Sequence, residues 1–339
     1  MGNTDSKEER ILVIGNGFDL YHGLRTRYYD FVQYTRQFHR NSSIAEICKG
    51  NNILKYFQNV VDKNDEWIDC EERIAFVVDL FSKVISKLEN KSQLQIPAEE
   101  LTEEEKFALK SFTKYVEKTN VQVFQMLSKW VNPYKELDKR KLLIALRNEL
   151  DEVITVLNFY LCEHVEMQRV EIFSEQIKNI EPMYVINFNY TNTCNRIYGI
   201  AENRILYVHG KVHSWFNNMV LGIEDNDDEN LDFVYYKKYF QCIQKRLKGL
   251  DCKQLEKTWG SNCKAYFFGH SLSKNDGEKI IEIEKSVQQM IIFYMNQEDY
   301  ERKIINLIKI FGKKNAVEKF RTNKIVFIEI EAPKSNLHR

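Results

Sequence analysis

The residues best suited to chemistry follow short apolar runs of the sequence. The first run ends at Ile14 and leads into GNGFD at residues 15–19. Glycines in this segment can adopt backbone angles closed to other residues, so that backbone N–H groups can approach an anion at the start of a helix. The spacing departs from the G-x-G-x-x-G fingerprint, because Leu20 stands at the third glycine position and the next glycine is Gly23. The segment therefore predicts a phosphate-binding turn and disfavours a common dehydrogenase.

Three later apolar runs also end in polar residues. Residues 183–187 lead into NFNYTNT at 187–193, residues 205–209 end in His209 and Gly210, and residues 264–268 lead into GHSL at 269–272. Ligands of open α/β sheets bind beyond the carboxyl ends of the strands. We therefore expect these four segments to converge on one cleft.

Short strands must position these residues. Runs of about five residues, rich in β-branched and aromatic types, predict six strands. Helical patterns separate most of them, so we predict an α/β fold with a Rossmann-like, mostly parallel sheet covered on both faces. The expected strands span residues 10–14, 183–187, 205–209, 264–269, 291–294 and 324–329.

The middle of the chain is almost free of glycine and proline and predicts a helical block. Apolar residues recur there with a spacing near 3.6, most clearly at 76–88 and 142–161. Thr102 and Glu105 form a capping box that would begin another helix. One strand precedes this block and the others follow it. We therefore expect a discontinuous nucleotide-binding domain, residues 1–33 and 180–339, with a large all-helical insertion at 34–179.

Composition limits the function classes. The 339 residues hold 49 Lys and Arg against 49 Asp and Glu, so net charge gives no argument for a nucleic acid partner. No secretory segment is evident, and no apolar run approaches the roughly 20 residues of a membrane span. The seven scattered cysteines form no C-x-x-C pair, which favours reduced thiols over a disulfide scaffold or a zinc cluster. We expect a cytoplasmic protein without a membrane partner.

Residues 302–324 form a basic stretch, with eight Lys or Arg and only Glu318 as an acid. The stretch favours a helix with a solvated basic face over a nucleic acid surface, although a toxin acting on RNA stays an alternative. In that helix the following apolar residues would pack inward: Ile304, Ile305, Leu307, Ile308 and Ile310.

The motifs resemble those of a known family. IGNGFDLYHGL at 14–24, NFNYTNT at 187–193, YVHG at 207–210 and FFGHSL at 267–272 are similar to the AbiH family of bacterial phage abortive-infection proteins. One departure is Arg25, where the family tends to have proline. The order G-x-G-x(5)-G, Asn-x-Asn, His-Gly and Gly-x-Ser-Leu is also similar to that of sirtuin-like NAD-binding domains.

The resemblance implies NAD as the ligand in the cleft. His209 would be the catalytic histidine beside the nicotinamide ribose, and Asn187 would position the ribose or the attacking water. Asn189 stands where sirtuins have an aspartate. No C-x-x-C pairs follow His209, so protein deacylation is disfavoured and no metal is assigned. The implied cofactor-binding residues lie in the glycine turn and the later strand exits: Gly15, Asn16, Gly17, Phe18, Asp19, His22, Asn189, Thr191, Gly269, His270 and Ser271.

Two functions stay open. The first is an antiphage NAD glycohydrolase that cleaves the nicotinamide–ribose bond, for which a histidine base and positioning amides are suitable. The second is a non-catalytic sensor of NAD or ADP-ribose that acts through a partner, which Asn189 favours. A phage-derived trigger and a second copy of the chain are the partners considered. Asp19 would either bind ribose or cap the following helix. His213, four residues after His209, has the spacing of a helical metal pair, but a helix after that strand is disfavoured.

Overall fold

The computed structural model describes residues 9–37, 43–61, 69–89, 101–112, 138–213, 217–224, 231–247, 262–331 and 334–335. The chain divides into a sheet unit, residues 1–26, 161–219 and 245–339, and a helical unit, residues 27–160 and 220–244. Three segments differ from the expected boundaries. Residues 27–33 belong to the helical unit and not to the expected nucleotide-binding domain. Residues 161–179 belong to the sheet unit, where the Ser174 amide bonds to the Tyr198 hydroxyl. Residues 220–244 belong to the helical unit, where the Tyr236 hydroxyl donates to the Leu146 carbonyl.

The sheet unit contains the predicted parallel sheet. Its six strands lie in the order β4-β3-β1-β5-β6-β7, and every neighbouring pair is parallel. Numbered one to six along the chain, this is the doubly wound order 3-2-1-4-5-6, which reverses direction between β1 and β5. The α/β, Rossmann-like prediction is therefore confirmed. The strands are β1 (Glu9–Ile14), β3 (Tyr184–Asn187), β4 (Ile205–Tyr207), β5 (Cys263–Phe268), β6 (Gln289–Tyr294) and β7 (Ile325–Glu329).

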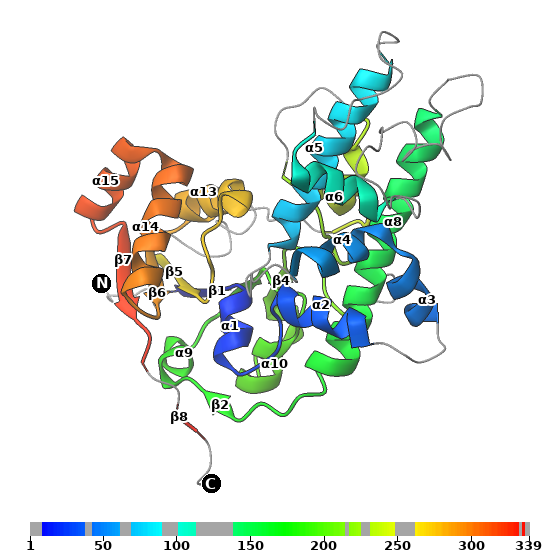
Figure 1. The fold of residues 1–339 in the computed structure, drawn as a ribbon. Coiled ribbons are helices and arrows are strands. Elements are labelled where there is room, and N and C mark those ends of the chain that lie inside the picture. Colours follow the sequence, from blue (N-terminus) through cyan, green and yellow to red (C-terminus); the bar gives the residue numbers. More distant parts are fainter. Residues whose placement is uncertain are drawn as a thin grey trace, which may run out of the picture. The chain divides into compact units, whose positions relative to one another are not determined.

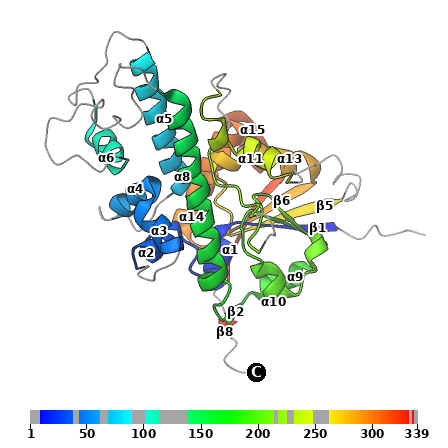
Figure 2. The ribbon, with the colours of Figure 1, turned by 90° about the vertical axis from the view of Figure 1, so that its right-hand side faces the viewer.

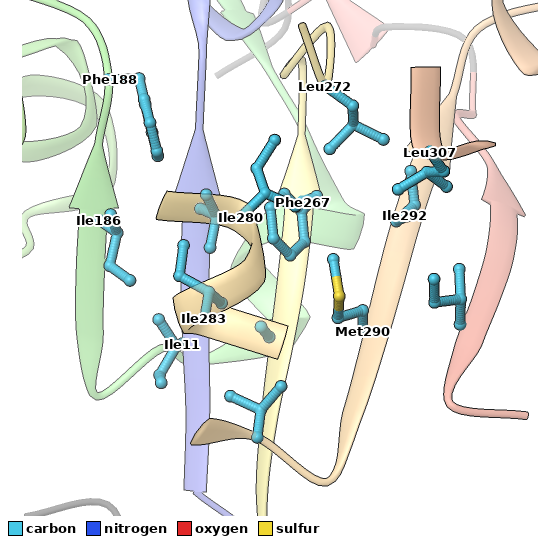
Figure 3. Close-up of a cluster of buried hydrophobic side chains, with 14 of the residues drawn as sticks. Ile11, Ile186, Phe188, Phe267, Leu272, Ile280, Ile283, Met290, Ile292 and Leu307 are labelled. Carbon is cyan, nitrogen blue, oxygen red and sulfur yellow. The ribbon is translucent and has the colours of Figure 1, made fainter. Parts of the chain in front are cut away.

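Alternation along β1 explains why both faces of the sheet are covered. Ile11 and Val13 join one buried apolar cluster, and Leu12 and Ile14 join another, because successive side chains of a strand point to opposite faces. Figure 3 shows the first cluster, in which Ile280 and Ile283 of a helix lie over β1 and β5. A strand buried on both faces must be apolar at every position, which is why 11–14 reads ILVI.

Helices connect the strands of this unit (Figure 1). They are α1 (Asn16–Tyr21), α9 (Glu175–Ile180), α10 (Thr193–Tyr198), α13 (Gly277–Ser286), α14 (Gln297–Phe311) and α15 (Lys313–Arg321). A π-helical turn, Leu161–Val165, precedes α9, and β2 (Ile172–Phe173) pairs antiparallel with β8 (Lys334–Ser335).

The helical unit confirms the helices expected in the middle of the chain. Residues 76–88 lie in α5 (Cys70–Glu89), and 142–160 lie in α8 (Lys139–Tyr160), on which α2, α3 and α4 pack (Figure 2). The Thr102 hydroxyl accepts from the Glu105 amide, and the Glu105 carboxylate accepts from the Thr102 amide, as predicted. The other helices are α2 (Tyr28–Gln37), α3 (Ser43–Gly50), α4 (Asn52–Val61), α6 (Glu103–Ser111) and α11 (Lys238–Gln244).

The basic stretch forms parts of α14 and α15, and one expectation about it is wrong. Leu307 is buried, but Ile305 and Ile308 are 52% and 36% exposed. The inward face of α14 instead carries Asp299 and Lys303 together with Leu307, at intervals of four residues. Lys303 can be buried there because its Nζ lies 2.5 Å from the Asp299 carboxylate.

Among the residues that the structure describes, no helix combines the length and apolarity needed to cross a membrane. The six cysteines within that part of the chain are free thiols, and Cys252 lies outside it. The same residues contain no group of three or more His, Cys, Asp or Glu able to hold a metal ion.

Candidate functional site at the carboxyl edge of the sheet

Three strands end side by side at the reversal point of the sheet. Ile14 of β1 pairs with Asn187 of β3 on one side and with Phe268 of β5 on the other. The glycine turn, the Asn-rich loop and the Gly-His turn therefore begin at the same level. Doubly wound sheets bind their ligands beyond this edge, at the point where the strand order reverses.

The glycines bring two of these loops into direct backbone contact. The Gly17 amide donates to the Gly269 carbonyl at 2.8 Å. A Cβ on Gly269 would lie 2.0 Å from the Phe18 nitrogen, and one on Gly17 would lie 2.7 Å from the Gly269 oxygen. Gly269 also has a φ of +65°, which disfavours a side chain. Packing of the two loops thus requires these glycines whether or not a phosphate binds.

Asparagine side chains fix the loop that follows β3. Asn187 is fully buried; its Oδ1 accepts from the Asn189 amide at 2.8 Å, and its Nδ2 donates to the Thr191 carbonyl at 3.0 Å. Asn189 Nδ2 donates to the Gly15 carbonyl at 2.9 Å. An aspartate at 189 has no N–H to donate when ionised, so the asparagine is what ties this loop to the glycine turn.

Asp19 is a buried carboxylate within α1. The helix begins after its N-cap residue Gly15, so Asp19 does not cap it. Asp19 Oδ2 accepts from the Thr191 hydroxyl at 2.6 Å, whereas Oδ1 has no hydrogen-bond partner among the described residues. Burial raises the pKa of Asp19 to about 6, although the hydroxyls of Thr191 and Thr193 act to lower it. A carboxylate that stays buried at this edge despite the desolvation penalty is a candidate functional group.

Two buried histidines from different strand exits face one carboxylate. His209 Nε2 lies 3.7 Å from Asp276 Oδ1, and His270 Nε2 lies 3.7 Å from Asp276 Oδ2. The Leu272 amide donates to His270 Nδ1 at 2.9 Å, which leaves the proton of a neutral ring on Nε2, toward Asp276. The Phe188 ring lies edge-on to both imidazoles. The fold therefore joins His209, His270 and Asp276 into one cluster at the carboxyl edge of the sheet.

Asp276 was missed by the sequence reasoning. It follows His270 by six residues and directly precedes the first residue of α13, Gly277. The available signal was an acidic residue before a helix, within the segment that leaves β5. The expected site segment ended at Leu272, and only the short helical turn Lys274–Asp276 returns the chain to the histidines.

Other predicted site residues have different surroundings. His22 donates from Nδ1 to the Phe18 carbonyl at 2.7 Å and accepts at Nε2 from the Tyr198 hydroxyl at 2.8 Å. Burial lowers the pKa of His22 to about 4. The Phe18 ring is buried edge-on to Phe268. Both side chains are thus part of the packed interior, whereas Asn16 and Ser271 are exposed at the edge.

The four motif segments and Asp276 lie within the range matched by one family model. That model, described as bacteriophage abortive infection AbiH, matches residues 11–296. No curated protein and no solved structure matches the chain. With most of its length matched, from β1 through the end of β6, the chain belongs to the AbiH family of bacteriophage abortive-infection proteins.

Proposed function

We propose that this abortive-infection protein binds NAD at the carboxyl edge of the sheet and hydrolyses its nicotinamide–ribose bond. One observation carries the proposal: the buried His209 and the partly exposed Asp276 lie 3.7 Å apart beside three strand exits at the reversal point of a doubly wound sheet. The carboxyl edge of such a sheet suits a dinucleotide, and a histidine beside a carboxylate suits a general base.

The proposed reaction uses water and the bound dinucleotide alone. His209 takes a proton from water while the water oxygen forms a bond to the ribose C1 carbon. The bond from that carbon to the pyridinium nitrogen breaks, and its electron pair neutralises the ring nitrogen, so that nicotinamide leaves uncharged. The products are ADP-ribose and a proton, which His209 releases to solvent. Asp276 would hold the imidazole and stabilise its cationic form.

The remaining residues would bind and orient the dinucleotide. The unpartnered Oδ1 of Asp19 is an acceptor suited to a ribose hydroxyl. Asn16 and Ser271 are exposed at the edge and would contact the phosphates and the adenosine half. Asn187 and Asn189 would act by holding the loop, because their amide groups already bond within it.

The alternative is a sensor that binds NAD or ADP-ribose without cleaving it. Two observations favour it: the Gly17 amide already bonds to the Gly269 carbonyl, and His209 is only 5% exposed. A sheet edge packed in this way fits a binding module, or an enzyme that opens when a phage-derived trigger or another copy of the chain binds.

The test is incubation of the whole protein with NAD, with nicotinamide followed by chromatography and NAD and ADP-ribose binding followed by calorimetry. The variants are His209→Ala and Asp276→Asn, and His164→Ala is the control because this histidine is exposed in the same unit. General-base catalysis contributes roughly 10²- to 10⁴-fold, so the His209 variant should lose at least about a hundredfold in rate.

Each outcome separates the alternatives. Release by the native protein and by His164→Ala, but not by His209→Ala, supports the hydrolase. Binding without release in all forms supports the sensor. Absence of both binding and release rejects NAD as the ligand of this edge.

A further inference from the structure

We propose that Cys162, His213 and Glu166 form a second reactive site in the sheet unit, in which the Cys162 thiol is a nucleophile toward acyl groups of esters and thioesters. The three side chains are separate from the His209 cluster and take no part in the NAD reaction proposed above. A thiol, an imidazole and a carboxylate in series are the parts of a base-activated nucleophile.

The geometry places the three groups in the required order. Cys162 Sγ lies 3.7 Å from His213 Nδ1, and His213 Nε2 lies 2.5 Å from Glu166 Oε2. The thiol and the carboxylate thus meet opposite nitrogens of one ring. With the ring proton on Nε2, bonded to Glu166, Nδ1 is left to accept the thiol proton. This is the relation of nucleophile, base and orienting acid found in covalent catalysis.

The backbone around the site is built to hold this arrangement. Cys162 belongs to the π-helical turn Leu161–Val165, and Glu166 follows directly after it, with its amide bonded back to the Leu161 carbonyl at 2.9 Å. Glu166 is held in turn by the Asn192 amide, which donates to its Oε1 at 3.3 Å. His213 has a φ of +55°, a conformation that costs energy for a residue other than glycine. Single π-helical turns and strained residues both occur often at functional sites.

Exposure and charge define how the thiol would work. The His213 side chain is 60% exposed, and Cys162 is partly exposed, so a substrate can reach the pair. Burial raises the pKa of the Cys162 thiol; a hydrogen bond from the His213 backbone lowers it, and the carboxylates of Glu166 and Glu163 raise it. The thiol is therefore protonated at rest and needs His213 as its base. The two carboxylates also disfavour anionic acyl donors.

The reaction transfers the acyl group in two balanced steps. Cys162 sulfur forms a bond to the acyl carbon while its proton moves to His213 Nδ1. The bond from the acyl carbon to the leaving oxygen or sulfur breaks, and the leaving group takes that proton. Water then attacks the thioester with His213 as base, which releases a carboxylic acid and restores the thiol.

The test uses the whole protein with p-nitrophenyl acetate, following p-nitrophenol release and locating the acetyl group by peptide mass spectrometry. We expect acetylation of Cys162 that is lost in Cys162→Ala and slowed by roughly 10²-fold in His213→Ala. Glu166→Gln should slow it less, because the amide oxygen can still accept from the ring. A p-nitrophenyl ester with a carboxylate on its acyl chain should react more slowly than the acetate.

Cys242 provides the matched control, because it is a partly exposed thiol in the helical unit. Cys242→Ala should leave the rate of p-nitrophenol release unchanged. Thermal unfolding of each variant verifies that it is folded. The proposal is overturned if Cys162 is acetylated no faster than Cys242, or if His213→Ala is folded and acetylates Cys162 at the native rate.

Discussion

Helix α1 and its C-cap residue carry two buried polar side chains, three residues apart, whose hydrogen-bonding groups are satisfied to different degrees. His22 is 2% exposed and uses both ring nitrogens, one with the Phe18 carbonyl and one with the Tyr198 hydroxyl. Asp19 is 1% exposed, and within the described part of the chain only one of its carboxylate oxygens has a hydrogen-bond partner, the Thr191 hydroxyl. Burial alone therefore does not separate a structural polar group from a ligand-binding one. The hydrogen-bonding capacity left over after folding does so.

The largest expected effect comes from a substitution that disrupts the contact between α1 and the turn after β5. Gly269→Ala should lower the free energy of unfolding by on the order of 4 kcal/mol, since a Cβ at Gly269 would lie 2.0 Å from the Phe18 nitrogen in α1. Urea unfolding measures this loss. Gly199→Ala is the control, because Gly199 has the same φ of +65° with no neighbour within 4 Å, and it should cost only about 1 kcal/mol. Equal losses in the two variants would show that the loop contact is unimportant.

His22→Phe should remove a dependence of stability on pH. Folding lowers the pKa of His22 from 6.5 to about 4. The contribution of the neutral imidazole to the free energy of unfolding is therefore fully present above pH 6.5, and it is lost as the pH falls toward 4. The full loss is about 3 kcal/mol. Relative to the native protein, the variant should therefore gain stability as the pH falls from 6.5 to 4. Unfolding free energies measured across this range test it, and a constant difference would contradict the neutral, buried imidazole.

Asp19→Asn should give the opposite slope. The pKa of Asp19 rises from 3.8 unfolded to about 6 folded, so the native protein loses stability as the pH rises from 3.8 through 6. The full loss is about 3 kcal/mol, slightly less than for His22 because the shift is smaller. The variant should thus be more stable than the native protein at pH 8 and similar to it at pH 3.5.

The same variant sharpens the functional side of the comparison. If Asp19 Oδ1 binds a ribose hydroxyl, Asp19→Asn should weaken NAD binding at pH 8, where calorimetry can detect it, while it stabilises the fold. If the variant is more stable and binds NAD with native affinity, Asp19 does not contact the ligand and its role is structural.

The smallest effect concerns the chain of hydrogen bonds behind His22. The Tyr198 hydroxyl donates to His22 and accepts from the Ser174 amide at 3.1 Å. Tyr198→Phe should cost about 1 to 3 kcal/mol, because it leaves a buried acceptor and donor unsatisfied. Nicotinamide release, if the native protein shows it, should be unchanged, because these hydrogen bonds lie in the interior. A drop in activity without a drop in stability would place His22 in the site after all.

Most of the fold was predictable from local patterns. The apolar runs, the near absence of glycine and proline in the middle and the Thr102–Glu105 capping box are signals within a few residues, and the structure confirms the elements that they predict. The inward face of α14 was not predictable in this way. Periodicity placed Ile305 and Ile308 inside, whereas the Asp299–Lys303 pair takes the buried face because the two charges neutralise each other.

The sequence by itself determined which polar segments leave the strands, because glycines and polar residues must follow the short apolar runs of a parallel sheet. It also determined the family, because the motifs stand in order along the chain. Only the tertiary structure decided which of these polar groups already have a partner within the protein. Asn189 bonds to Gly15 across 174 residues, His22 bonds to Tyr198 across 176, and Asp276 joins His209 and His270 from another loop. Hydrogen-bond partners so distant along the chain become neighbours only when the sheet brings the strand ends together.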